Sequence, residues 1–199
     1  MTAQSLGRFG VPVVLAAVDS TNDYVRRFIP QRRPRVVMAA AQTAGRGRFG
    51  RCWHSPAGAG LYVSYLLFPE WDAARSPFLN VVASLAVVRT LRRLSSGLDL
   101  RIKEPNDVLA GGRKIAGILV ELATLGTRID WAVVGIGLNV GQTVFPEDLP
   151  AATSLALQGV SAQPEELLGP LSEELEAGLV QCDQGDFEAL NQAYLREQR

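Results

Sequence analysis

Cysteine and histidine are scarce in this chain, which has two cysteines and one histidine in 199 residues. Cys52 and Cys182 have neither the spacing of a metal site nor that of a disulfide framework, and His54 is the single histidine. A zinc site built from histidine and cysteine is therefore not expected. Because disulfides are sparse in reducing compartments, the low cysteine content favours a cytoplasmic setting.

An excess of charge of either sign is also missing, since Lys+Arg and Asp+Glu both number 20. No overall field therefore draws the protein to DNA or to an anionic membrane. No apolar run approaches the roughly 18 residues of a membrane helix, and the first residues lack the cationic and apolar segments of a signal peptide. We expect neither DNA nor a membrane as a partner, and we expect any basic chemistry to be local.

The remaining composition is that of an ordinary globular enzyme, with 47% hydrophobic and 20% charged residues. The length fits one domain that spans residues 1–199. The chain contains neither the G-x-S-x-G motif of hydrolases nor the Walker lysine motif of P-loop proteins. Both of these enzyme classes are therefore disfavoured.

Strand-like and helix-like patterns alternate along the chain. The strand-like segments are residues 11–18, 36–41, 61–68, 100–103, 108–109, 114–123 and 129–138. The first helix-like segment is short, capped by Ser20 and closed by Pro30 and Pro34. The others are residues 77–94, 164–181 and 186–197, and Gly97 ends the first of these three. Gly-Gly and Leu-Gly turns between the central strands imply antiparallel pairing. The sequence thus predicts an α+β fold with a mixed, mostly antiparallel sheet flanked by helices.

A loop rich in glycine and arginine, residues 45–51, matches the dinucleotide-binding pattern G-x-G-x-x-G. That pattern requires a helix to begin within it, but residues 53–60 contain a proline and two glycines and cannot continue a helix. We therefore set a Rossmann fold aside. What remains is a flexible loop whose guanidinium groups, from Arg46, Arg48 and Arg51, suit a di- or triphosphate, or else an ordinary solvated surface loop.

Lys114 begins an unusually apolar strand. Because side chains alternate along a strand, we expect Lys114 to share a face with Ala116, Ile118 and Val120, and Gly117 to leave room on the other face. Two interpretations are open. The lysine is either a cation at a strand end that reaches water, or an ammonium group held in a pocket to bind an anion.

Three further features each have a functional and a structural interpretation. Asn106 and Asp107 can hold Mg²⁺ against phosphates or form a Pro-Asn-Asp turn. The segment 135–139 allows close approach of a ligand, with Asn139 as a hydrogen-bonding residue, or serves packing alone. Trp53 is either a stacking surface for a purine or a core residue.

Together, the order and spacing of these motifs from about residue 18 to 140 resemble the biotin protein ligase family. The motifs that carry the resemblance are Ser20-Thr21-Asn22, Gln42 to Arg51 with Trp53 and Ser55-Pro56, Lys103 to Asp107, Arg113 to Leu119, and Gly135 to Asn139. The resemblance implies a fold shared with lipoate ligases and class II synthetases. It also implies a two-step, ATP-dependent reaction, in which biotinyl-5′-AMP and pyrophosphate form first and biotin then passes to a lysine of a biotin carboxyl carrier protein.

The resemblance also implies roles for individual residues. It places Ser20, Thr21, Asn22, Gln42, Gly45, Arg46, Gly117 and Lys114 at biotin, with Arg46 and its backbone at the carboxylate. It places Arg48, Arg51, Trp53, Asn106, Asp107 and Asn139 at ATP or the adenylate, with Mg²⁺ at Asp107. The catalytic residues would be Lys114, Arg48 and Arg46. The loop of residues 45–51 would close over the adenylate.

Some features depart from the family pattern. The family motif is usually Lys-Trp-Pro-Asn-Asp, and Glu104 replaces the tryptophan, which either weakens local packing or puts a negative charge near the nucleotide. We also expect the usual small C-terminal β-barrel to be absent, and the few residues before Ser20 to be too short for the DNA-binding winged helix of repressor-type members. A lipoate-type ligase and a non-catalytic biotin- or adenylate-binding module remain alternatives, and a homodimer through an exposed sheet edge stays open.

Overall fold

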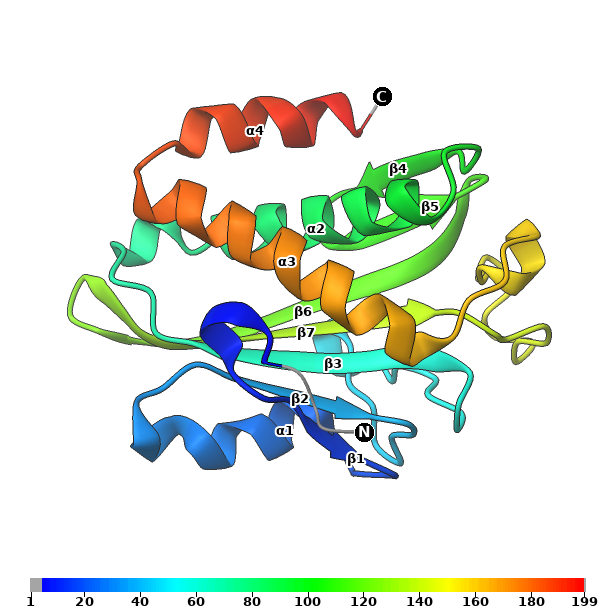
Figure 1. Ribbon diagram of the computed structural model, residues 1–199, viewed down its shortest axis with the longest axis horizontal. Coiled ribbons are helices and arrows are strands. Elements are labelled where there is room, and N and C mark those ends of the chain that lie inside the picture. Colours follow the sequence, from blue (N-terminus) through cyan, green and yellow to red (C-terminus); the bar gives the residue numbers. More distant parts are fainter. Residues whose placement is uncertain (1–4, 199) are drawn as a thin grey trace.

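The computed structural model describes residues 5–198, which form one seven-stranded sheet in the order β1-β2-β3-β7-β6-β5-β4 (Figure 1). The strands are β1 (Val13–Leu15), β2 (Arg35–Ala39), β3 (Gly60–Leu67), β4 (Leu100–Lys103), β5 (Asp107–Ala110), β6 (Arg113–Leu125) and β7 (Arg128–Asn139). The pair β1–β2 is parallel, and every other neighbouring pair in this sheet is antiparallel. The predicted mixed, mostly antiparallel sheet is confirmed.

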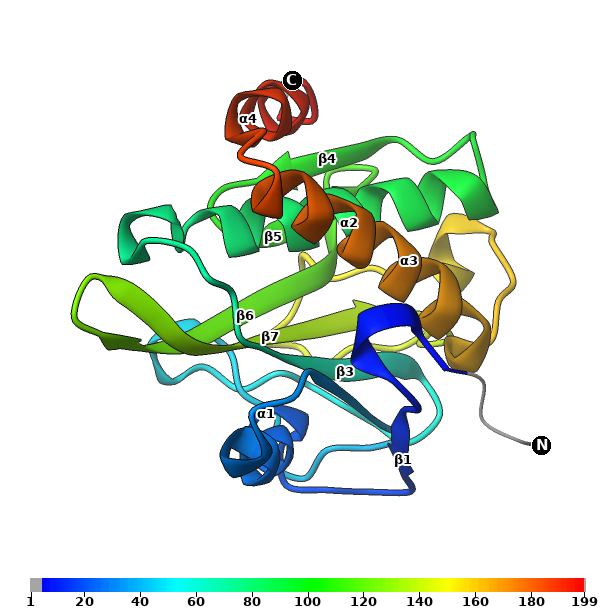
Figure 2. The same ribbon diagram turned by 60° about the vertical axis from the view of Figure 1, so that its left-hand side comes forward.

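Helices lie on both faces of the sheet. Two long helices, α2 (Phe78–Leu94) and α3 (Pro164–Asp183), cover one face, and α4 (Phe187–Arg196) lies beside α2 near β4 (Figure 1 and Figure 2). The short helix α1 (Thr21–Val25), continued by a 3₁₀ segment over Arg26–Gln31, lies against the opposite face near β2 and β3. The part of this second face that α1 leaves uncovered is available for a ligand.

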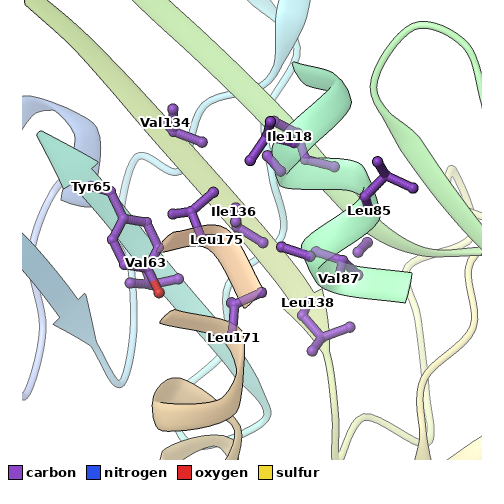
Figure 3. Close-up of a cluster of buried hydrophobic side chains, with 14 of the residues drawn as sticks. Val63, Tyr65, Leu85, Val87, Ile118, Val134, Ile136, Leu138, Leu171 and Leu175 are labelled. Atoms are coloured by element: carbon purple, nitrogen blue, oxygen red, sulfur yellow. The ribbon is translucent and has the colours of Figure 1, made fainter. Parts of the chain in front are cut away.

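The main core lies between the sheet and the helices α2 and α3. Alternate side chains of the two central strands point into it, because successive residues of a strand face opposite sides. Figure 3 shows Val63 and Tyr65 of β3 and Val134, Ile136 and Leu138 of β7 beside Leu85 and Val87 of α2 and Leu171 and Leu175 of α3. The residues between them, including Ser64, Gly135 and Gly137, therefore face the other side of the sheet.

One strand departs from simple alternation in a way that decides the site. Ile115 and Ala116 are consecutive, and both are fully buried in the main core, because β6 has an extra residue at the β-bulge where it pairs with β5. The bulge turns Lys114 toward the face of Gly117, where a Cβ added to that glycine would lie 3.4 Å from Lys114 Nζ. The expectation that Lys114 shares a face with the apolar residues at alternate positions after it is therefore wrong.

Other expectations for local structure hold with small differences. The loop of residues 45–51 contains only a 3₁₀ turn over Arg48–Gly50, so the absence of a helix there is confirmed. Ser20 is the N-cap of α1, but its side chain makes no capping hydrogen bond. Helix α2 ends at Leu94 with Ser95 as its C-cap, before the expected Gly97, since Ser95 already has an extended backbone. Among the described helices, none has the length and apolarity that a membrane span requires.

Candidate functional site

A cavity of about 440 Å³ opens on the face of the sheet opposite α2 and α3. It brings together residues from every motif of the sequence. The expected site residues that line it are Ser20, Thr21, Asn22, Gln42, Arg46, Arg48, Arg51, Trp53, Asn106, Asp107, Lys114, Gly117 and Asn139. Gly45 is buried beside the cavity, where a side chain would come within 2.5 Å of the Trp53 carbonyl oxygen. Only glycine fits at this point of the loop.

The floor of the cavity is made of glycines. Gly117 of β6 pairs with Gly137 of β7, and the indole of Trp53 lies directly on both. A Cβ at Gly137 would lie 2.4 Å from two atoms of that indole, and a Cβ at Gly117 would lie 2.8 Å from it. The Trp53 Nε1 atom is buried and has no hydrogen-bond partner among residues 5–198. The two glycines thus give an aromatic ring access to the strand backbone.

One end of the cavity is a chain of polar side chains. Ser64 donates a 2.5 Å hydrogen bond to Asn22 Oδ1, and its oxygen lies 2.8 Å from the hydroxyl of Thr21. The Thr21 backbone N–H and hydroxyl both donate to Gln42 Oε1, at 2.9 and 3.0 Å. Gln42 in turn donates to Ser55. These side chains come from α1, β3 and the loop after β2, so only the folded chain assembles them.

The cavity also holds a lysine and an aspartate. Lys114 Nζ forms a 2.6 Å salt bridge with Asp107 Oδ1, and it lies 5.3 Å from the centroid of the Trp53 ring. The backbone of Lys114 is fixed on its other side, because its N–H donates to the carbonyl of Ala151 and its carbonyl accepts from the N–H of Thr153. The ammonium group is thus held at a set position within the cavity.

The segments on either side of this pair add further polar residues to the cavity. Asn106 donates from Nδ2 to the Ile118 carbonyl, and its Oδ1 accepts a 3.4 Å hydrogen bond from Arg48. Asn139 is 4% exposed and donates to the carbonyl of Thr153. Asn139 therefore anchors the segment 141–153. That segment also contributes lining residues that the sequence motifs did not indicate, namely Phe145, Leu149 and Ala152.

Arg46 is anchored rather than free. Its NH2 nitrogen donates to Asp23 Oδ1 at 2.8 Å and to Glu121 Oε2 at 2.7 Å. Glu121 and Ser64 were not predicted as site residues. In the sequence, each is a polar residue within an apolar strand. Such a residue indicates a site only if it lies on the face of the sheet that the core does not occupy.

Asp107 offers a carboxylate to a cation, and Glu104 also lines the cavity. Among the described residues, no group of three or more His, Cys, Asp or Glu side chains is arranged to hold a metal ion. A site with one or two carboxylates is the arrangement in which Mg²⁺ takes its other ligands from phosphates and water. The donor set therefore fits a magnesium ion that arrives with a nucleotide.

The two cysteines are expected to differ in reactivity. Cys52 is exposed at the cavity, whereas burial, together with the charge of Asp183, raises the pKa of the Cys182 thiol to about 12. Because the thiolate is the reactive form, Ellman's reagent at pH 8 should titrate one thiol in the folded protein and two after denaturation. Cys52→Ser should remove the fast-reacting thiol. Fast reaction of both thiols in the folded protein would contradict this assignment.

Comparison with known proteins identifies relatives of this chain. The Biotin/lipoate A/B protein ligase family matches residues 14–139. The chain is 41% identical over 124 residues to the bifunctional ligase/repressor BirA of Bacillus subtilis, which covers 61% of this chain and 38% of that protein. It is 36% identical over 192 residues to the biotin–[acetyl-CoA-carboxylase] ligase of Paracoccus denitrificans, covering 92% of this chain and 78% of that one.

The fold has solved relatives as well. A biotin protein ligase from Aquifex aeolicus, in complex with biotin and ATP, superposes with a TM-score of 0.78 at 28% identity, over 94% of this chain and 78% of that one. The chain thus spans well under half of the Bacillus protein and most of the Paracoccus and Aquifex ones. The family profile, the sequence relatives and the fold agree, and the chain belongs to the biotin/lipoate A/B protein ligase family.

Proposed function

We propose that this chain is the catalytic domain of an ATP-dependent biotin protein ligase. In the first step the biotin carboxylate attacks the α-phosphorus of ATP, which forms biotinyl-5′-AMP and releases pyrophosphate. In the second step the amine of a carrier-protein lysine attacks the acyl carbon, which forms an amide and releases AMP. The named relatives, one a biotin–[acetyl-CoA-carboxylase] ligase and one solved with biotin and ATP, support this proposal.

The single observation that carries the proposal is the position of Lys114. The first step brings two anions together, so a fixed cation is needed to offset their repulsion where water is excluded. Lys114 supplies an ammonium group inside the cavity, 2.6 Å from Asp107 and 5.3 Å from the centroid of the Trp53 ring. The two substrates would therefore meet at this lysine.

The polar end favours biotin over lipoate. Thr21, Asn22, Gln42 and Ser64 present hydroxyl and amide groups in one place. A ureido ring has N–H donors and a carbonyl acceptor that can form hydrogen bonds with such groups, whereas a dithiolane ring offers them neither. The polar end thus selects against the lipoate alternative.

The nucleotide would take the opposite end, near Arg48, Asn106 and the segment 141–153. Mg²⁺ would neutralise charge on the phosphates when bound, with Asp107 as its protein ligand. Asp107 and Lys114 also hold each other in place before the nucleotide arrives. The loop of residues 45–51 covers one side of the cavity and would keep water from the hydrolysable adenylate.

A direct assay tests the proposal. The protein is incubated with biotin, Mg-ATP and a biotin carboxyl carrier domain, and both the adenylate and the modified carrier are detected by mass spectrometry. We expect biotinyl-AMP without the carrier and a biotinylated lysine with it. Lipoyl transfer in place of biotin would support a lipoate-type ligase, and biotin binding without any adenylate would support a non-catalytic module.

A further inference from the structure

Glu121 lies behind the lining of the cavity, where it contacts Asn22 and Arg46 of that lining as well as Arg26. Its Oε1 forms a 2.6 Å salt bridge with Arg26, and its Oε2 accepts from Arg46 and from Asn22 Nδ2, both at 2.7 Å. Its side chain is 20% exposed. A carboxylate with this many charge-assisted contacts, partly withdrawn from water, strongly restricts the geometry of its partners. Glu121 thus contacts both helix α1, through Asn22, and the loop of residues 45–51, through Arg46.

The contact with Asn22 determines which way its amide points. A carboxylate only accepts hydrogen bonds, so the NH₂ group of Asn22 must face Glu121 and its oxygen must face Ser64. Ser64 then directs its proton to Asn22 Oδ1. Asn22 itself packs on Gly135, where a Cβ would lie 2.2 Å from Asn22 Oδ1. Glu121 therefore determines which groups at the polar end donate hydrogen bonds and which accept them.

The contact with Arg46 fixes the entry of the glycine- and arginine-rich loop. Arg46 is bound to Glu121 on β6 and to Asp23 on α1, and Arg26 bridges the same two acids. This cluster of two arginines and two acids is balanced in charge. It ties the loop to the sheet at the point where the loop begins to cover the cavity.

We propose that Glu121 is a positioning residue for ligation: it orients the Asn22 amide and, through Arg46, anchors the loop over the bound acyl group. The inference rests on the proposed function. It also changes the role of Arg46 from the catalytic one that the resemblance implies. Its guanidinium holds the loop through Glu121 and Asp23 and does not act on the reacting atoms. The loop backbone beside Arg46 stays available to a carboxylate.

The test is the kinetics of Glu121→Gln, which keeps the shape of the side chain and removes its charge. We expect KM and Kd for biotin to rise by about tenfold to a hundredfold, the scale of lost hydrogen bonds to a charged group. The rate constant of adenylation at saturating biotin should stay within about threefold of the wild type, since Glu121 does not touch the reacting atoms. Release of biotinyl-AMP into solution should become faster.

Glu174→Gln is the matched control, because Glu174 also pairs with two arginines, Arg89 and Arg93, but lies on α3 away from the cavity. It should leave the biotin parameters unchanged. Arg46→Met should reproduce the rise in KM with little loss of the rate constant, and it serves as the test if Glu121→Gln does not fold. The double variant should be little worse than either single one.

The outcomes separate this inference from the proposed function. Absence of biotinyl-AMP with the wild-type protein would overturn the proposed function. If the wild-type protein forms the adenylate, two results would overturn the role of Glu121 alone. One is an unchanged biotin KM in Glu121→Gln, and the other is that the effects of Arg46→Met and Glu121→Gln simply add. A large fall in the adenylation rate constant of Arg46→Met would assign that guanidinium to the chemistry instead.

Discussion

Replacing Lys114 with alanine is expected to lower the rate of biotinyl-AMP formation by at least about a hundredfold, while the protein remains folded. Losing one fixed group that stabilises developing charge costs roughly 10²–10³ in rate. In the proposed mechanism Lys114 is such a group, because the bulge in β6 aims it into the cavity and the strand-like contacts with residues 151–153 hold its backbone. Pyrophosphate release with saturating biotin and Mg-ATP measures the effect.

Two comparisons make the Lys114 result specific. Arg101→Ala removes an exposed cation on β4 whose salt-bridge partner is the neighbouring Asp99, and it should leave pyrophosphate release unchanged. The unfolding temperature of Lys114→Ala should stay close to the wild type, because its salt bridge with Asp107 is partly exposed and such pairs contribute little. Unaltered pyrophosphate release by a folded Lys114→Ala protein would remove the basis of the proposed mechanism.

Replacing Gly137 with alanine is expected to cost a similar factor in activity through a single methyl group. The new Cβ would lie 2.4 Å from the Trp53 indole, so the ring must leave the glycine floor. Displacements of about 1 Å at an active site can cost about a hundredfold in rate. The strand itself should tolerate alanine, because the backbone of Gly137 is not in the left-handed region.

A double variant identifies the cause of the Gly137 effect. If the clash with Trp53 is responsible, Gly137→Ala combined with Trp53→Ala should be no less active than Trp53→Ala alone. Gly97→Ala is the control, because a Cβ there meets open space. If Gly137→Ala had wild-type adenylation kinetics, the glycine floor would have no role in placing the ring.

Much of the fold was predictable because its signals are local. The continuous apolar run of β3 and the nearly all-apolar sequence of α2 are set by neighbours in sequence, and the structure has these elements within a few residues of their predicted bounds. The proline and glycines after Trp53 excluded a Rossmann helix on the same grounds. Helix α1 was harder, because it passes into a 3₁₀ segment that contains Pro30.

The candidate site was predictable in its members but not in their contacts. The motifs named nearly every residue that lines the cavity, since each motif is a short stretch of chain. Glu121 and Ser64 were missed, because a polar residue in a strand reveals its role only when the opposite face of the sheet is known to be core. Asn139 was expected at the nucleotide, and the structure shows its amide holding the carbonyl of Thr153.

The sequence by itself determined the elements, the glycine-rich loop and the set of motifs, because these depend on backbone preferences over a few consecutive residues. Only the tertiary structure decided that Lys114 points into the cavity, since that depends on a bulge in the pairing of β5 with β6. It also decided that Arg46 is bound by Asp23 and Glu121, which lie 23 and 75 positions away along the chain. Strand register and long-range ion pairs leave no local pattern in a sequence.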